Sequence, residues 1–160
     1  MDRTKYNEMS HKLKDMISKG ELNGRKILLF GHCNATEELA DLILNNGLEI
    51  SAILDNNPSK HGLSYRDIPI SPPEKSMDAE YKGAVVLIVT RFYEAMNRQL
   101  RDLGFLGDVI KLIDYNTYAE YSISTETISR KKDRLNLGRK IIEELKEKYP
   151  GCFRYCCGTW

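Results

Sequence analysis

Apolar and polar positions along the chain form successive blocks that predict helices and strands in turn. Over residues 4–20, apolar residues recur at spacings of three and four, which predicts an amphipathic helix that ends at a glycine. Residues 27–30 are all apolar and predict a buried strand, whereas residues 35–43 return to helical spacing. Residues 48–54 are again mostly apolar and predict a second strand. Strand, helix and strand together indicate a βαβ unit over residues 25–55.

The second half of the chain repeats this alternation. Residues 84–90 are apolar on both alternations, as expected for a strand that is covered on both faces. A short strand is predicted at residues 68–70, and we place it at a sheet edge because Pro69 has no amide proton. The helix after residue 90 is predicted to bury a stripe formed by Phe92, Ala95, Met96, Leu100 and Leu103. Further predicted elements are a strand at residues 109–113, a charged amphipathic helix at residues 130–149 and a strand within residues 152–160.

These elements predict a three-layer, Rossmann-like α/β domain. Right-handed crossovers would give a mainly parallel five-stranded sheet of order 3-2-1-4-5, with added N-terminal and C-terminal helices. We divide the 160 residues into an N-terminal helix and turn (1–24), a nucleotide-binding domain (25–114), and a connector with the C-terminal helix and the start of a further strand (115–160). The pattern stops where another αβ unit would continue, which raises the alternative that the chain is a fragment of a longer protein.

Charge and composition narrow the range of partners. Lys and Arg number 24 and Asp and Glu 23, so the net charge of +1 gives no extended field of one sign, and we expect no nucleic-acid partner. The longest apolar run falls far short of the roughly 20 residues that span a bilayer, so we expect no membrane insertion and a cytoplasmic location. The four cysteines do not resemble a disulfide framework and are interpreted as reduced thiols.

The turn between the first strand and its helix is the strongest candidate for a binding site. Gly31 is followed by His32, Cys33 and Asn34, and Asn34 is predicted to cap the helix with Glu37 in capping-box position. Free amides and the helix dipole favour a phosphate or diphosphate at such a turn. The competing interpretation is a turn that serves only the topology.

The dinucleotide fingerprint is incomplete at this turn. G-x-G-x-x-G places three glycines, whereas this chain has Gly31 followed by Cys33 and Thr36 at the other two positions. Cys33 also lies near the helix start, which favours a thiolate, but the sequence places no base beside it. We identify no catalytic residue and no metal site from the sequence.

Two further strand ends complete the predicted binding site. Asp55 and Asn56 follow the second strand, and Asp55 lies 24 residues after Gly31, where a carboxylate accepts hydrogen bonds from a ribose; the alternative is a simple Asx turn. Thr90 and Arg91 end the fourth strand at the same edge, where Arg91 would meet a phosphate or remain solvated. The complete set of predicted binding residues is Gly31, His32, Cys33, Asn34, Asp55, Asn56, Thr90 and Arg91.

One segment carries a resemblance to a known family. Residues 53–62, ILDNNPSKHG, are followed by IPI at 68–70 and PPE at 72–74. This pattern resembles a recurring segment of Rossmann-like nucleotide-sugar or NAD(P)-binding domains in bacterial surface (capsular) polysaccharide biosynthesis proteins, including sugar-modifying acyltransferases and nucleotide-sugar dehydratases. The likeness covers about residues 26–113. It implies that Gly31 contacts a diphosphate and that Asp55 contacts the nucleoside, with a nucleotide-sugar or NAD(P) as the ligand.

The resulting hypothesis is a nucleotide or nucleotide-sugar binding domain that acts in polysaccharide biosynthesis without a complete catalytic set of its own. Its expected partners are a small-molecule nucleotide and either further copies of the chain or a fused downstream domain. Two alternatives remain open. One is an NAD(P)-dependent oxidoreductase domain, and the other is a ligand-free Rossmann scaffold that mediates protein assembly.

Overall fold

The computed structural model describes residues 1–115 and 125–148, which belong to two compact units, residues 1–115 and 116–160. The first unit holds helices α1 (Arg3–Ser18), α2 (Asn34–Asn45) and α3 (Tyr93–Leu103) and strands β1 (Ile27–Phe30), β2 (Ala52–Leu54), β3 (Ser64–Tyr65), β4 (Ile68–Ser71), β5 (Val85–Ile88) and β6 (Asp108–Lys111). Short 3-10 turns occur at Pro58–Lys60, Pro73–Met77 and Ala79–Tyr81. The second unit contributes α4 (Thr125–Lys148), while the strand expected within residues 152–160 lies outside the described residues.

The sheet confirms the predicted strand order. Its six strands run in the order β3-β4-β2-β1-β5-β6. The five strands predicted from the sequence are β1, β2, β4, β5 and β6, and they occur in the predicted order 3-2-1-4-5. All neighbours among these five pair in parallel, and only β3 is antiparallel, against β4. In the centre, Leu29 of β1 is in register with Ile53 on one side and Leu87 on the other. The Rossmann-like α/β fold is therefore present, with one additional edge strand.

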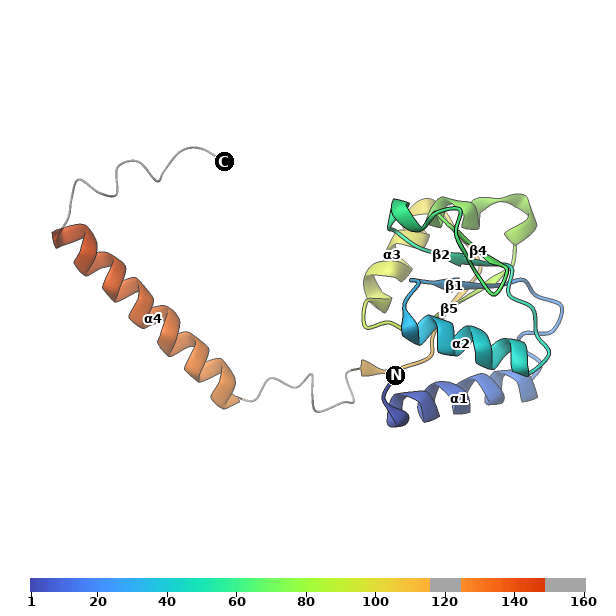
Figure 1. The fold of residues 1–160 in the computed structure, drawn as a ribbon, viewed down its shortest axis with the longest axis horizontal. Helices are drawn as coiled ribbons and strands as arrows, with labels where there is room; N and C mark the ends of the chain where they lie inside the picture. The colour runs from blue at the N-terminus through green and yellow to red at the C-terminus, as the bar shows by residue number, and fades with distance from the viewer. Residues whose placement is uncertain (116–124, 149–160) are drawn as a thin grey trace. The chain divides into compact units, whose positions relative to one another are not determined.

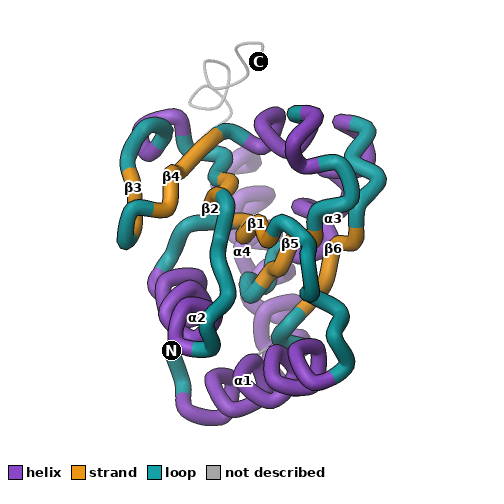
Figure 2. The backbone as a smooth tube through the Cα atoms, turned by 90° about the vertical axis from the view of Figure 1, so that its right-hand side faces the viewer, coloured by secondary structure: helices purple, strands orange, loops and turns teal. Residues whose placement is uncertain are grey.

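Helices cover both faces of this sheet. Figures 1 and 2 show α1 and α2 side by side on one face and α3 on the other. Every residue of β1, β2 and β5 is buried, as the continuous apolar runs require for strands covered on both sides. The helices contribute fully buried side chains, namely Met9 and Leu13 from α1, Leu39 and Ile43 from α2, and Leu100 from α3.

The prediction that residues 68–70 form an edge strand is wrong, because β3 occupies that edge. The chain turns back through Arg66 and Asp67, both with positive φ (46° and 63°), and pairs Ser64 with Pro69. Contacts with α2 hold the hairpin: the Tyr65 hydroxyl donates to Asp41 at 3.0 Å, and the Arg66 guanidinium donates to the same carboxylate at 3.1 Å. These long-range contacts stabilise a turn that the local sequence does not favour.

Two other predictions need correction in detail. Only residues 52–54 of the predicted second strand, which began at residue 48, form β2. Phe92 is 55% exposed and Ala95 is also exposed, although both belong to the predicted buried stripe. Phe92 precedes the first helical residue, so its side chain does not follow the helical spacing, and Tyr93 and Met96 pack against the core instead.

Candidate functional site

The predicted binding residues gather at the carboxyl ends of β1, β2 and β5. At this point β1 is flanked by β2 on one side and β5 on the other, and the helices that follow β1 and β5 cover opposite faces of the sheet. Open parallel sheets form a crevice at such a topological switch point. The structure brings Gly31, His32, Asp55 and Thr90 together there, as the following contacts show.

Gly31 has a backbone conformation that requires glycine and lies in a crowded packing environment. Its φ is +90°, and its amide donates to the Leu54 carbonyl at 2.8 Å, which continues the pairing of β1 with β2. A Cβ at this position would lie 2.8 Å from Cε of Met96 and 3.3 Å from Cγ2 of Thr90. The Thr36 hydroxyl donates to the Gly31 carbonyl, so the threonine that replaces a fingerprint glycine fixes the turn through a side-chain hydrogen bond.

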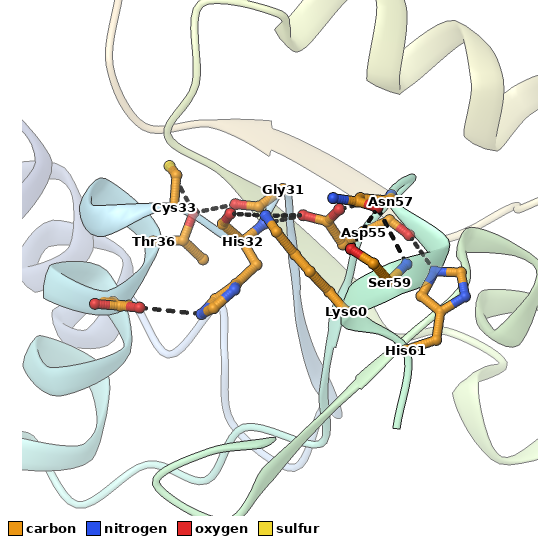
Figure 3. Close-up of polar contacts among 10 residues, drawn as sticks. Gly31, His32, Cys33, Thr36, Asp55, Asn57, Ser59, Lys60 and His61 are labelled. Atoms are coloured by element: carbon orange, nitrogen blue, oxygen red, sulfur yellow. Dashed lines mark hydrogen bonds and ion pairs between the residues drawn. The ribbon is translucent and has the colours of Figure 1, made fainter. Parts of the chain in front are cut away.

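Asp55 is the centre of the hydrogen-bond network in Figure 3. Its side chain is almost completely buried, with Oδ2 accepting from the His32 amide at 2.7 Å and Oδ1 accepting from the Asn57 amide at 2.8 Å. Lys60 Nζ lies 3.3 Å from Oδ2 and also donates to the His32 carbonyl at 2.7 Å. Asp55 therefore forms the Asx turn considered above and ties the loop after β2 to the first turn. Ribose binding by Asp55 stays a prediction.

The same contacts determine the ionisation of Asp55. Burial by itself raises the pKa of this carboxyl, but the backbone amides of Asn57 and His32, together with Lys60, more than offset burial, and the pKa lies below its ordinary value. Asp55 is therefore a carboxylate at neutral pH. The network joins a buried negative charge to one lysine and two fixed backbone dipoles.

Lys60 and His61 belong to this network, although neither is among the binding residues predicted from the sequence. Asn57 Oδ1 accepts from the Ser59 amide at 3.1 Å and from the Ser59 hydroxyl at 2.8 Å, which shapes the 3-10 turn Pro58–Lys60. This turn brings Lys60 back over Asp55 and places His61 Nε2 2.7 Å from the Asp55 carbonyl. The available signal was the polar run DNNPSKH, which directly follows the buried strand β2.

The N-terminus of α2 differs from its prediction. Asn34 was expected to cap the helix, but it is the first helical residue and the cap position belongs to Cys33, which is extended (φ −155°, ψ 171°). Cys33 makes no side-chain cap hydrogen bond, and its sulfur lies 3.5 Å from the Thr36 hydroxyl. The Asn34 and Ala35 amides donate to no acceptor within the part of the chain that the structure describes. Two donors at the positive end of the helix dipole are thus available to an anion.

His32 lies beside this helix start rather than in open solvent. Its side chain is 19% exposed, and Nε2 lies 3.1 Å from a carboxylate oxygen of Glu37, without the geometry of a hydrogen bond. The ring centres of His32 and Tyr65 lie 6.2 Å apart. The predicted capping-box residue Glu37 therefore faces His32, and an ion pair forms only when the imidazole is protonated.

Asn56, Thr90 and Arg91 make contacts of a different kind. Asn56 forms two reciprocal amide hydrogen bonds with Gln99 of α3, at 2.8 and 3.0 Å. The Thr90 hydroxyl accepts from the Phe92 amide at 3.3 Å and donates to the Met96 sulfur at 3.4 Å. Arg91 is exposed, with its guanidinium 5.0 Å from the centre of the Phe92 ring. Among these three residues, Thr90 lies against Gly31, whereas Asn56 is engaged by α3.

The contacts of Cys33 and the arrangement of acidic and metal-ligating groups show what the described residues of this site can do chemically. Cys33 has the Thr36 hydroxyl as its polar neighbour, and a hydroxyl does not activate a thiol in the way that a histidine base does. Within residues 1–115 and 125–148, no group of three His, Cys, Asp or Glu side chains is arranged to hold a metal ion. What the site offers is a set of amide donors, one exposed arginine and a rigid turn.

Comparison with known proteins identified one similar solved structure. It is the crystal structure of RSP, a Rex-family repressor, with a TM-score of 0.47, 20% sequence identity, and coverage of 88% of this chain and 71% of that chain. No protein-family model matches the chain. No curated protein matches it either.

These comparisons correct the functional expectations from the sequence. The comparison contradicts the assignment to capsular polysaccharide biosynthesis, because the solved structure that it identifies is a repressor. The expectation of no nucleic-acid partner is contradicted by the same comparison, since the similar structure is described as a repressor. In the described residues, no helix is both long enough and apolar enough to cross a membrane.

Proposed function

We propose that this chain is a nucleotide-binding Rossmann domain whose ligand places a phosphate against the N-terminus of α2. The observation that carries the proposal is the pair of Asn34 and Ala35 amides, which have no acceptor among the described residues, at a helix start whose cap residue supplies none. Helix starts of this kind bind anions through amide donation and the helix dipole. Their position at the switch point of a parallel sheet is where nucleotides bind in this fold class.

The neighbouring residues support a phosphate more strongly than a sugar as the anchor. Asp55, the carboxylate expected to bind a ribose, already accepts from two backbone amides and from Lys60. Arg91, at the end of the adjacent strand β5, is exposed and adds a positive charge at the same edge of the sheet. A cytoplasmic location belongs to this proposal, since Cys33 is a free, exposed thiol.

The proposal is tested by removing one amide proton without disturbing the helix. In Asn34→Pro, proline occupies the first helical position, which tolerates it, and the preceding Cys33 is already extended as proline requires. Calorimetric titration of the full chain with AMP, ADP, NAD⁺ and NADH should show binding by at least one ligand. The variant should bind that ligand at least about tenfold more weakly, because a charge-assisted hydrogen bond is lost.

A matched control places the same substitution at the start of another helix. Arg3 is the first residue of α1 and follows Asp2, which is also extended, so Arg3→Pro removes an equivalent amide proton away from the site. Its affinity should equal that of the wild-type chain. Absence of binding to all four ligands at millimolar concentration would contradict the proposal and favour the ligand-free scaffold. Equal affinity of Asn34→Pro and wild type would exclude the N-terminus of α2 as the phosphate site.

A further inference from the structure

The opposite end of the sheet carries an apolar pocket that the proposed nucleotide site does not use. The pocket has a volume of about 240 Å³ and lies beside Gly83 and Gly107, which precede β5 and β6. Apolar and aromatic groups dominate its lining, among them Met77, Tyr81 and Phe105. Because β5 and β6 are parallel, this pocket is at their amino ends, and the candidate nucleotide site is at the carboxyl end of β5.

Leu106 projects from the rim of this pocket. Its side chain is 94% exposed, although its neighbours Phe105 and Gly107 are both buried. The Arg101 guanidinium holds the loop on both sides of Leu106 by donating to the Phe105 carbonyl at 2.7 Å and the Gly107 carbonyl at 2.9 Å. The loop is also pressed against the sheet, since a Cβ at Gly107 would lie 2.2 Å from the Ala84 carbonyl oxygen. Leu106 is therefore held outward by a fixed loop.

Charges of both signs surround the pocket. Lys75 pairs with Asp78 at 2.6 Å and lies 3.8 Å from Glu80. Lys82 is exposed and makes no ion pair with the described residues. The two lysines and the two carboxylates of this rim balance one another, and the Arg101 guanidinium donates to the two loop carbonyls. Lys82 and the loosely held Glu80 supply opposite charges for a contact with a second molecule.

We propose that this surface, formed by the pocket, Leu106 and the charged rim, binds a second copy of the chain about a two-fold axis. Leu106 of each chain enters the pocket of the other, and Lys82 of each chain pairs with Glu80 of the other. A two-fold interface uses the same patch on both chains, so a patch that carries both a projecting side chain and a pocket is complementary to itself. A cavity of about 150 Å³ accepts a benzene-sized molecule, and this pocket exceeds that volume.

The fixed loop favours this association. A projecting side chain on a mobile loop loses conformational freedom on binding, whereas Leu106 is already held by Arg101 before the partner arrives. Buried apolar side chains that fill pockets at the centre of an interface contribute most of its affinity. The dimer leaves the carboxyl ends of the strands accessible, so nucleotide binding and dimerisation are independent properties of the chain.

Sedimentation velocity of the full chain, under reducing conditions and over a range of about 1 to 500 µM, tests the proposal. The wild-type chain should change from monomer to dimer with increasing concentration. Leu106→Glu should remain monomeric, because a charge cannot enter an apolar pocket. Leu63→Glu is the matched control: Leu63 is 56% exposed on the same unit but does not line the pocket, so this variant should dimerise like the wild type.

A charge exchange tests the interface without relying on Leu106. Lys82→Glu and Glu80→Lys should each raise the dimer dissociation constant at least tenfold, because each places like charges opposite one another. The double variant Lys82→Glu/Glu80→Lys should restore the wild-type constant. Circular dichroism melting curves that match the wild type for all variants establish that loss of the dimer is not loss of the fold.

Four outcomes would overturn the proposal. The first three are a wild-type chain that is monomeric at all concentrations, a Leu106→Glu variant that dimerises as well as the wild type, and a double charge variant that fails to recover. The second outcome would assign dimerisation to another surface of the chain. If Leu63→Glu also abolished the dimer, the effect of Leu106→Glu would reflect added charge in general and the assignment to this pocket would be wrong.

Discussion

The two ends of the parallel sheet differ in their surroundings, because one holds a network of charged and polar groups and the other holds a mainly apolar pocket. At the carboxyl ends, the turn at Gly31 and the loop after Asp55 are held by hydrogen bonds between side chains and backbone. At the amino ends, the loop that carries Leu106 closes an apolar pocket and is held by the Arg101 guanidinium. Strand direction accounts for part of the contrast, because helices begin at the carboxyl ends and present free amides there. Substitutions at the two ends should therefore differ in size, in pH dependence and in sign.

The largest effect is expected at Gly31. Gly31→Ala forces an L residue into positive φ and brings its Cβ against Met96 and Thr90, so we expect about 2–4 kcal/mol loss in the free energy of unfolding. Gly47→Ala is the control, because Gly47 also has positive φ (+75°) but no atom within 4 Å of the added Cβ. Gly47→Ala should lower the free energy of unfolding by about 1–2 kcal/mol. Urea unfolding at pH 7 measures both, and equal losses would show that the packing around Gly31 contributes nothing.

Asp55→Asn should lower the free energy of unfolding nearly as much as Gly31→Ala, and it should make the stability of the protein less sensitive to pH. An amide nitrogen in place of Oδ2 would face the His32 amide and Lys60, which are both donors. We therefore expect the free energy of unfolding to fall by about 2–3 kcal/mol at pH 7. The folded pKa of Asp55 is lowered, so its stabilisation is complete above the unfolded pKa of about 3.9 and is lost as pH falls through the folded value. Urea unfolding at pH 7 and pH 3 should therefore give a smaller difference between the two proteins at pH 3. A constant difference would contradict this account.

A smaller effect is expected for the amide pair between Asn56 and Gln99. Its two hydrogen bonds join the loop after β2 to α3, but both groups are accessible to water that replaces them. A double-mutant cycle with Asn56→Ala and Gln99→Ala should give a coupling energy of about 0.5 kcal/mol. Additive losses in chemical unfolding would mean that the pair is absent in solution.

The smallest effect should have the opposite sign and belongs to the apolar end. Ser76 is 2% exposed, and its hydroxyl oxygen has no hydrogen-bond partner among the described residues. Ser76→Ala removes this unpaired group with little change in volume, so the free energy of unfolding should rise by less than about 0.5 kcal/mol. A higher melting temperature by calorimetry is the expected result. A loss of stability would show that the hydroxyl finds a partner in solution.

The strand order was predictable because it follows from long apolar runs and right-handed crossovers, which do not depend on individual contacts. β3 was not predictable, since Arg66 and Asp67 lack the glycine that typically marks a tight hairpin and the turn depends on Asp41, which lies far away in sequence. The same reason applies to Phe92, whose spacing fits the buried stripe although the helix begins one residue later.

At the candidate site, the sequence predicted where residues lie better than it predicted which groups their side chains contact. Asp55 was selected from its separation from Gly31 along the sequence, and in the structure it does lie beside the Gly31 turn. Its partners include backbone amides, which no residue pattern specifies. Lys60 was missed because its contact with the His32 carbonyl depends on the 3-10 turn that shapes the loop. The predicted cap, Asn34, is the first helical residue, and the cap position one residue earlier belongs to Cys33. The side-chain acceptor that the prediction placed at the helix start is therefore missing.

The two-residue strand β3 also affects how this sheet behaves at high protein concentration. A sheet edge is a template for pairing with strands of other molecules, and long, flat, apolar edges promote aggregation. β3 offers only Ser64 and Tyr65 for such pairing and ends in a turn that carries the charged residues Arg66 and Asp67. The opposite edge, β6, begins with Asp108 and ends with Lys111. Short length and charge at both edges protect the chain from indiscriminate strand addition.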